Sequence, residues 1–153
     1  MKHPAAIFDM DGSLCDVSSV RYHVNPNDPR FSGTKRFDLF HAGSIDCPPN
    51  KLALREYELA AGQGLAIIIV TARKEQWLYH TMLWLVEQGI EWDELFMRAD
   101  DDNRKDYLVK EDILGEIKAR GYEPVLAVDD NPAILAVWKR HGIETVRVPG
   151  WEE

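Results

Sequence analysis

The stretch HPAAIFDMDGSLCD, residues 3–16, carries a short apolar run directly before two carboxylates. The run AAIF is typical of a buried β-strand, and the carboxylates belong to Asp9 and Asp11. Like charges at this spacing raise each other's pKa, so the pair needs a compensating positive charge. A second acidic pair far along the chain, Asp129 and Asp130, suggests that the two pairs share a cation.

The composition bounds the class of protein. The chain has 153 residues, enough for one domain with its own core, and we expect residues 1–153 to form that single domain. A net charge of −8 argues against a broad nucleic-acid-binding face, although a few clustered arginines could hold a chain end. The first residues lack the apolar core of a signal peptide, so we expect a cytoplasmic protein without a membrane span. Cys15 and Cys47 are expected to be reduced thiols, with a single disulfide as the alternative.

Short apolar runs alternate with amphipathic segments along most of the chain. The run LAIIIV is apolar on both faces, which suits a strand covered on both sides in a parallel sheet. The alternation predicts an α/β fold with right-handed crossovers between parallel strands. The expected strands lie at residues 5–8, 65–70, 94–97, 124–128 and 143–148, and the expected helices at residues 51–61, 74–88, 107–120 and 132–141.

Apolar side chains at helical spacing predict the buried face of each helix. They are Leu52 and Leu59 in the first helix, with Tyr57 as a further candidate, Leu78, Met82, Leu85 and Val86 in the second, and Val109, Ile113 and Ile117 in the third. Trp77 and Trp84 are expected to pack in the protein and not to stack on bases. Gly89 and Gly121 follow two of these segments and are typical of helix ends.

Residues 17–50 interrupt this alternation, because they are polar, rich in proline and too long for a plain connection. We interpret them as an irregular insertion over the carboxyl edge of the sheet, with one short strand or helix near KRFDLF. The insertion is either a surface loop or a small lid. His23, His41, Phe37 and Phe40 lie in it, and we favour packing over substrate contact for all four.

Polar residues follow three of the expected strands. Ligands of doubly wound sheets bind at the carboxyl ends of the strands, so these residues are expected to meet in one crevice. They are Asp9 and Asp11 after the first strand, Thr71 in VTAR after the second, and Asp129 and Asp130 in AVDDNP after the fourth, with Lys110 on the helix before that strand. Four carboxylates in one crevice require a hard divalent cation, and Mg²⁺ completed by a substrate phosphate is the natural choice.

Four motifs in this order, DMDGSL, VTAR, a lysine on a helix and VDDNP, resemble those of the haloacid dehalogenase-like (HAD) superfamily of phosphohydrolases. The similarity spans almost the whole chain. It implies a Rossmann-like HAD fold, a parallel five-stranded sheet flanked by helices, with a small insertion after the first motif. We expect the strand order 5-4-1-2-3.

The resemblance also implies a mechanism. Asp9 would attack phosphorus to form an aspartyl phosphate, and Asp11 would protonate the leaving oxygen and then deprotonate the hydrolytic water. Thr71 and Lys110 would orient the phosphoryl oxygens. An aspartate at position 11 marks the phosphatases and phosphotransferases of the superfamily, whereas its dehalogenases lack it.

A metal site is implied by the same motifs. The HAD pattern assigns Mg²⁺ to the Asp9 carboxylate, the backbone carbonyl of Asp11, and the acids Asp129 and Asp130, directly or through water.

A narrower resemblance lies in RADDDNRKDYLVKEDIL, residues 98–114, which is similar to the 3′-phosphatase domain of phage polynucleotide kinase-phosphatase. It implies that Arg98 and Lys110 lie in the phosphate site and that Arg73 binds substrate, while Arg21 is a looser match. The alternative for Arg73 and Arg98 is solvation or a salt bridge to the acidic ADDD loop. The chain has no GxxxxGK[ST] loop, so we expect no kinase activity within these residues. TAR stands where that family has a serine and a glycine before the arginine.

These observations together predict a Mg²⁺-dependent phosphomonoesterase that acts as a polynucleotide 3′-phosphatase in nucleic-acid repair, in a phage setting. The substrate would be a nucleic-acid 3′ end or a nucleotide, with no obligate protein partner. One alternative is a small-molecule phosphatase for nucleotides or sugar phosphates, which the acidic net charge favours. The other is a non-catalytic HAD-like binding module.

Overall fold

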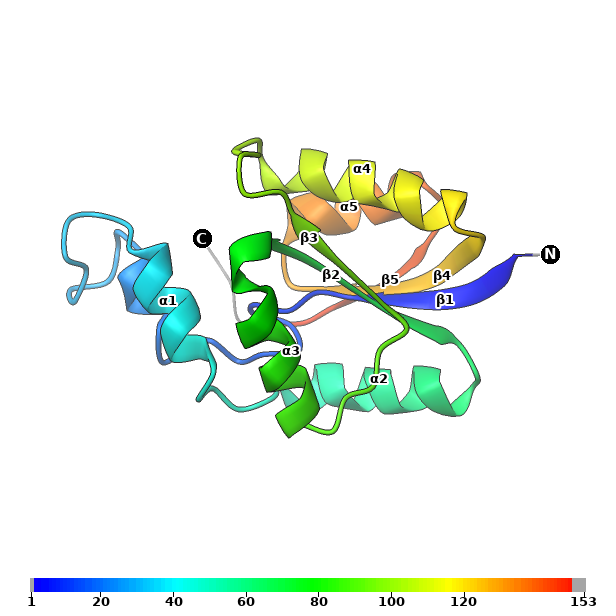
Figure 1. The fold of residues 1–153 in the computed structure, drawn as a ribbon, viewed down its shortest axis with the longest axis horizontal. Coiled ribbons are helices and arrows are strands. Elements are labelled where there is room, and N and C mark those ends of the chain that lie inside the picture. Colours follow the sequence, from blue (N-terminus) through cyan, green and yellow to red (C-terminus); the bar gives the residue numbers. More distant parts are fainter. Residues whose placement is uncertain (1, 150–153) are drawn as a thin grey trace.

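A computed structural model describes residues 2–149 of the chain. Within these residues five strands form one sheet with the order β3-β2-β1-β4-β5, and all neighbouring strands are parallel (Figure 1). This is the predicted order 5-4-1-2-3 counted from the other edge of the sheet. The strands are β1 (His3–Phe8), β2 (Ala66–Lys74), β3 (Glu94–Arg98), β4 (Tyr122–Asp129) and β5 (Glu144–Arg147).

Strand β1 lies at the centre of the sheet, and its apolar run is buried on both faces. Ala6 and Phe8 pack into one core cluster, and Ala5 and Ile7 pack into another. The first core lies between the sheet and the helices α2 (Lys51–Gly62) and α3 (Leu78–Glu87). The second lies on the opposite face, between the sheet and the helices α4 (Asp106–Ala119) and α5 (Pro132–Arg140) (Figure 1). A parallel strand covered on both sides needs apolar residues at successive positions, which explains the run AAIF.

The helices begin and end at residues whose chemistry favours those ends. The Asn50 side chain accepts hydrogen bonds from the backbone N–H groups of Leu52 and Ala53, and Asn131 caps α5, whose first residue is Pro132. Gly89 and Gly121 follow α3 and α4 with φ values of +71° and +91°, a conformation that L residues with side chains rarely adopt.

The predicted helix at residues 74–88 begins too early. Strand β2 continues to Lys74, and a 3-10 turn, Glu75–Trp77, precedes α3. This extension places VTAR inside β2. Beyond an irregularity in register after Thr71, Lys74 of β2 pairs with Arg98 of β3.

The predicted buried faces of α2 and α3 are wrong in most positions. Leu52 and Leu59 are 42% and 49% exposed, and the buried positions of α2 are the small residues Ala53 and Ala60. In α3 the buried side chains are Thr81, Trp84 and Leu85, while the other predicted core residues, Leu78, Met82 and Val86, are exposed. Small side chains let α2 approach the sheet closely, which a leucine stripe would prevent. The predictions for Val109, Ile113 and Ile117 in α4 are confirmed.

The insertion at residues 17–50 projects beyond the sheet (Figure 1). It contains a 3-10 turn, Arg21–His23, and α1 (Phe37–Ser44), so the expected short element near KRFDLF is a helix. Phe40 is buried in the core cluster beneath α2 and α3, whereas Phe37 is 52% exposed. The insertion is therefore fixed to the core through α1.

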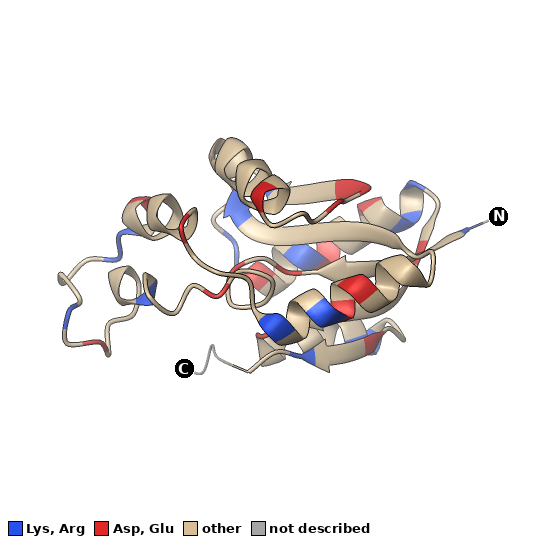
Figure 2. Cartoon of the chain, turned by 90° about the horizontal axis from the view of Figure 1, so that it is seen from below, with Lys and Arg blue, Asp and Glu red and all other residues tan. Residues whose placement is uncertain are grey.

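The distribution of charge agrees with the acidic composition. Figure 2 shows lysines and arginines scattered over the helices, the loops and the insertion, with acidic residues between them. No helix within residues 2–149 is long and apolar enough to cross a membrane. Cys15 and Cys47 are both buried and are not joined by a disulfide.

Candidate active site

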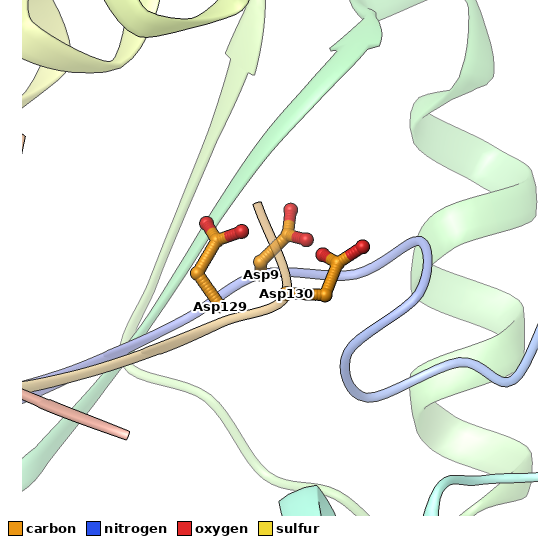
Figure 3. A group of neighbouring side chains, drawn as sticks. All are labelled: Asp9, Asp129 and Asp130. Carbon is orange, nitrogen blue, oxygen red and sulfur yellow. The ribbon is translucent and has the colours of Figure 1, made fainter. Parts of the chain in front are cut away.

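Three buried carboxylates meet at the carboxyl ends of the two central strands. Asp9 follows β1, Asp129 ends β4, and Asp130 comes directly after it. The pairing of β1 with β4 brings these ends together, and the Asp9 N–H donates to the Val128 carbonyl at 3.1 Å. Carboxylate oxygens of the three aspartates lie within 4.8 Å of one another, and their carboxyl groups point to the same side (Figure 3).

Lys110 supplies one positive charge to this cluster from α4. Its Nζ lies 2.8 Å from Oδ1 of Asp9 and 2.9 Å from Oδ2 of Asp129, and the residue is only 1% exposed. Burial alone would lower the pKa of Lys110, but the charges of Asp129 and Asp9 outweigh burial and raise that pKa, so the ammonium stays charged. The predicted meeting of Lys110 with the aspartates is present in the structure.

One ammonium does not neutralise three carboxylates. Burial, followed by the charge of Asp9, raises the pKa of both Asp129 and Asp130 above the ordinary carboxyl range. A raised pKa means that these groups are costly to hold as anions side by side. The donor set consists of carboxylate oxygens alone, which suits a hard divalent cation such as Mg²⁺.

Gly12 and Ser13 of the first motif lie close to Asp130 of the last motif. The Ser13 hydroxyl lies 3.0 Å from Oδ2 of Asp9 and 3.0 Å from Oδ1 of Asp130, so it can donate to either one. Gly12 has a φ of +81°, and a Cβ there would lie 2.4 Å from Oδ2 of Asp130. Ser13 had no predicted role; its place in the same motif as the two aspartates is the signal that could have found it.

Asp11 has a different partner from Asp9. Nε of Arg73 lies 2.9 Å from Oδ2 of Asp11, and Nη2 of Arg73 also bonds Oδ1, so the arginine contacts both oxygens. Burial would raise the pKa of Asp11, but the charge and hydrogen bonds of Arg73 hold it below its ordinary value. The side chain of Asp11 is outside the group of three carboxylates that could hold a metal.

Arg73 is itself buried, at 2% exposure, and links three elements. Beyond Asp11, its guanidinium donates to the Thr81 hydroxyl of α3 and to the Ser44 hydroxyl of α1, both at 3.1 Å. Its backbone N–H donates to the hydroxyl of Thr71 at 3.1 Å, and Thr71 is 1% exposed. The strand β2 thus places the predicted hydroxyl and the predicted arginine two residues apart at the same edge of the sheet.

His41 lies closer to these residues than we expected from the sequence. Its Nδ1 is 3.8 Å from Oδ2 of Asp11, and its ring lies against the rings of Phe37, Phe40 and Trp77. Burial lowers the pKa of His41 to about 4, so the ring is neutral at neutral pH. Nothing in the sequence pattern separates His41 from the other histidines, because its position depends on how the insertion folds back.

Arg98 bonds the loop before α4. Its guanidinium donates to the carbonyl oxygens of Ala72, Asp102 and Arg104 and to the carboxylate of Asp106. Its Nη1 also lies 3.9 Å from Oδ1 of Asp102, which is the alternative that the sequence left open, a salt bridge to the acidic ADDD loop. A contact between Arg98 and phosphate stays a prediction.

Arg21 lies in the insertion and lines a cavity of about 210 Å³. The same cavity is bordered by Gly12, Asp16 and Asn50, which places it beside the loop that follows β1. The predicted substrate contact of Arg21 would require part of the substrate to enter this cavity.

Several solved structures share the fold of this chain. A chain of the Pnkp1/Rnl/Hen1 RNA repair complex superposes with a TM-score of 0.75 and 23% identity, over 96% of this chain and 42% of that one. The class C acid phosphatase from Bacillus anthracis with tungstate bound superposes with a TM-score of 0.70 and 13% identity, over 99% of this chain and 69% of that one. A hydrolase from Streptococcus pneumoniae TIGR4 superposes with a TM-score of 0.59 and 16% identity, over 95% and 92% of the two chains. At these identities the likeness shows the fold, and this chain spans less than half of the protein from the RNA repair complex.

A protein-family model matches almost the entire sequence. The family is described as the polynucleotide kinase PNKP phosphatase domain, and the match covers residues 3–150. The matched range includes the three clustered aspartates, the lysine beside them, and the arginine that holds Asp11.

Proposed function

This chain belongs to the polynucleotide kinase PNKP phosphatase domain family of the HAD phosphatases, and we propose that it hydrolyses phosphomonoesters through an aspartyl phosphate with the help of Mg²⁺. The observation that carries the proposal is the buried cluster of Asp9, Asp129 and Asp130 around the ammonium of Lys110. Membership of this family makes the chain a phosphatase, that is, a hydrolase. The metal, the intermediate and the substrate are the proposed parts.

Asp9 is the proposed nucleophile. One of its oxygens forms a bond to phosphorus while the bond between phosphorus and the leaving oxygen breaks, which gives an acyl phosphate on Asp9. Lys110 and Ser13 contact its two oxygens, at 2.8 Å and 3.0 Å respectively, and fix the carboxylate in place. A water molecule then attacks the phosphorus and releases inorganic phosphate.

Asp11 is the proposed general acid and base. In the first step it gives a proton to the leaving oxygen, and in the second step it takes a proton from the attacking water. Its ion pair with Arg73 favours the charged form, so the acid role needs Arg73 to be drawn away. A phosphoryl group is a strong ligand for arginine, and its binding to Arg73 would leave the half-buried Asp11 with a higher proton affinity.

The residues of the cluster fit Mg²⁺ by the chemistry of their donors. Asp9, Asp129 and Asp130 offer closely spaced carboxylate oxygens, and the backbone carbonyl of Asp11 is the further ligand proposed from the HAD pattern. The ion supplies charge neutralisation at the phosphoryl oxygens. Thr71 and Lys110 would bind and orient the same oxygens from β2 and α4.

The proposed substrate is a nucleic-acid 3′ end that carries a phosphate. Family membership supports it, as do the arginines near the site, with Arg73, Arg98 and Arg21 as the proposed substrate contacts. The small-molecule alternative is favoured by the net charge of −8. The binding-module alternative is disfavoured because the residues of the proposed mechanism are all in place.

The setting of the protein is proposed on the same grounds. A reducing cytoplasm is compatible with two buried thiols that do not form a disulfide. A role in phage nucleic-acid repair rests on the resemblance to the phage enzyme. The RNA repair assembly belongs to the similar protein, and we propose no obligate partner for this chain.

Phosphate release with Mg²⁺ from a matched set of substrates tests the proposal. The set contains a 3′-phosphorylated oligonucleotide, its 5′-phosphorylated counterpart, and free nucleoside 3′- and 5′-monophosphates. We expect fastest release from the 3′-phosphorylated oligonucleotide, and none with a chelator or with Asp9→Asn. Faster turnover of free nucleotides would establish the small-molecule alternative, and no release from any substrate would contradict the proposed reaction.

A further inference from the structure

We propose that His41 is a positioning residue for Asp11, so that helix α1 of the insertion completes the active site. The inference rests on the phosphatase reaction proposed above. Its basis is a buried imidazole nitrogen beside the carboxylate that acts as acid and base.

Nδ1 of His41 is buried without a hydrogen-bond partner among residues 2–149. The residue is 7% exposed, and the nearby charged oxygen is Oδ2 of Asp11, at 3.8 Å. A buried polar atom without a hydrogen bond is costly, and such atoms in native proteins call for an explanation. A shift of about 1 Å would bring the two atoms to normal hydrogen-bond length.

The aromatic surroundings hold the ring of His41 in this orientation. The ring centroids of Phe40 and Trp77 lie 5.1 and 5.2 Å from that of His41, and the centroid of Phe37 lies 6.1 Å away. Phe40 is itself buried in the core. The three aromatic rings therefore hold the plane of the His41 ring beside Asp11.

Helix α1 also contacts the partner of Asp11. The Ser44 hydroxyl accepts from Nη2 of Arg73 at 3.1 Å and donates to the His41 carbonyl at 2.7 Å. One short helix thus contacts both members of the Asp11–Arg73 pair. A displacement of α1 would disturb both contacts together.

The expected role follows from the competition for Arg73. When a phosphoryl group binds the guanidinium, Asp11 loses hydrogen bonds that fix both of its oxygens. A hydrogen bond between Nδ1 of His41 and Oδ2 would then keep the carboxyl group oriented toward the leaving oxygen. His41 itself touches neither the phosphoryl group nor the leaving group in this role.

Leaving groups of different basicity separate this role from a structural one. An alkyl or nucleoside oxygen must be protonated as it leaves, whereas p-nitrophenolate leaves without a proton. A residue that acts through Asp11 therefore matters for the first kind of substrate and hardly for the second. A residue that only stabilises the fold affects both alike.

Three substitutions at position 41 give the test. His41→Phe keeps an aromatic ring and removes the nitrogens, His41→Asn places an amide near the position of Nδ1, and His41→Gln places it near that of Nε2. We expect His41→Phe to lower kcat about tenfold for a nucleoside 3′-monophosphate, the size of one hydrogen bond to a charged group, and less than twofold for p-nitrophenyl phosphate. His41→Asn should restore most of the loss, and His41→Gln should not. Equal losses on both substrates, or no loss, would overturn the proposal.

A second measurement is independent of turnover. The nitrogen NMR resonance of His41 Nδ1 should shift in Asp11→Asn, because the facing oxygen changes from an anion to an amide group. It should move much less in Asp129→Asn, which alters the metal cluster. An unmoved resonance in Asp11→Asn would reject the role of His41 even if the wild-type chain released no phosphate. Absent wild-type turnover together with a shifted resonance would instead reject the proposed reaction and leave the contact standing.

Discussion

Arg73 contacts both carboxylate oxygens of Asp11, with Nε 2.9 Å from Oδ2 and Nη2 bonded to Oδ1. The two aspartates of the DMD sequence therefore face different cations, since Asp9 bonds Lys110 instead. This division explains how two carboxylates two residues apart can lie together in one buried site. It also fits the different roles proposed for them, because the carboxylate of Asp9, and not that of Asp11, belongs to the group of three that could hold a metal.

The Asp11–Arg73 pair should show strong energetic coupling. Arg73→Met removes a buried cation and leaves the carboxylate without its main partner, so we expect a loss of about 3 kcal/mol in the free energy of unfolding. The double variant Asp11→Asn with Arg73→Met should lose much less than the sum of the single variants. Urea denaturation of the four proteins measures this coupling. Additive losses would show that the pair is not coupled in solution.

Stability without metal should fall as the pH rises. The pKa of Asp129 is raised from 3.8 to about 6, and that of Asp130 from 3.8 to about 9. Between pH 3.8 and about pH 9 the folded chain therefore binds more protons than the unfolded one. That stabilisation is complete below pH 3.8 and is lost as the pH rises through about 6 and then about 9. His41 has a lowered pKa and acts in the opposite direction, but only below its ordinary value of 6.5. Between pH 6.5 and pH 9 we therefore expect the Tm of the metal-free chain to decrease.

Mg²⁺ should reverse this loss. A cation bound to ionised carboxylates stabilises the folded chain more at pH 9 than at pH 6.5, because fewer protons must be displaced. Asp130→Asn is the control, since at pH 9 it should raise the Tm of the metal-free chain, and it should weaken the response to Mg²⁺. Thermal denaturation with a chelator and with Mg²⁺ gives both quantities. A response to Mg²⁺ that is independent of pH would contradict the proposed ligands.

Gly12 should tolerate no side chain. Gly12→Ala would place a Cβ 2.4 Å from Oδ2 of Asp130 at a φ of +81°, so we expect Asp130 to be displaced, with weaker Mg²⁺ activation and a loss of phosphatase activity. Gly115→Ala is the matched control, because Gly115 lies within α4 and a Cβ there meets nothing within 4 Å. That variant should keep full activity and gain about 0.5–1 kcal/mol in stability. Full Mg²⁺ activation in Gly12→Ala would show that the loop can move away from Asp130.

The sequence predicted those parts of the structure that depend on periodicity and chain order. Runs such as AAIF and LAIIIV fix buried parallel strands, and parallel strands bring their carboxyl ends to one edge, so the meeting of Asp9 with Asp129 could be predicted. The buried faces of α2 and α3 could not, because they depend on how closely each helix approaches the sheet. Ala53 and Thr81 are buried for reasons of shape that hydrophobicity does not capture.

The parts of the site that were not predicted depend on the insertion and on side-chain direction. The residues next to His41 in the sequence do not predict that α1 packs beside Asp11. The bond of Arg73 to Asp11, in place of an arginine open to phosphate, depends on the path of β2, whose helical interpretation at Lys74 was wrong. Charge patterns predict which residues meet, and the pairing among them is decided by geometry.

Trapping of a phosphoenzyme tests the central claim most directly. The chain is mixed with Mg²⁺ and a substrate labelled in its phosphoryl group, quenched in acid within the first turnover, and digested to locate the label. We expect an acid-stable, hydroxylamine-sensitive phosphoryl group on the peptide that contains Asp9, and none in Asp9→Asn. Turnover with no labelled peptide, or a label on a residue other than Asp9, would contradict the account.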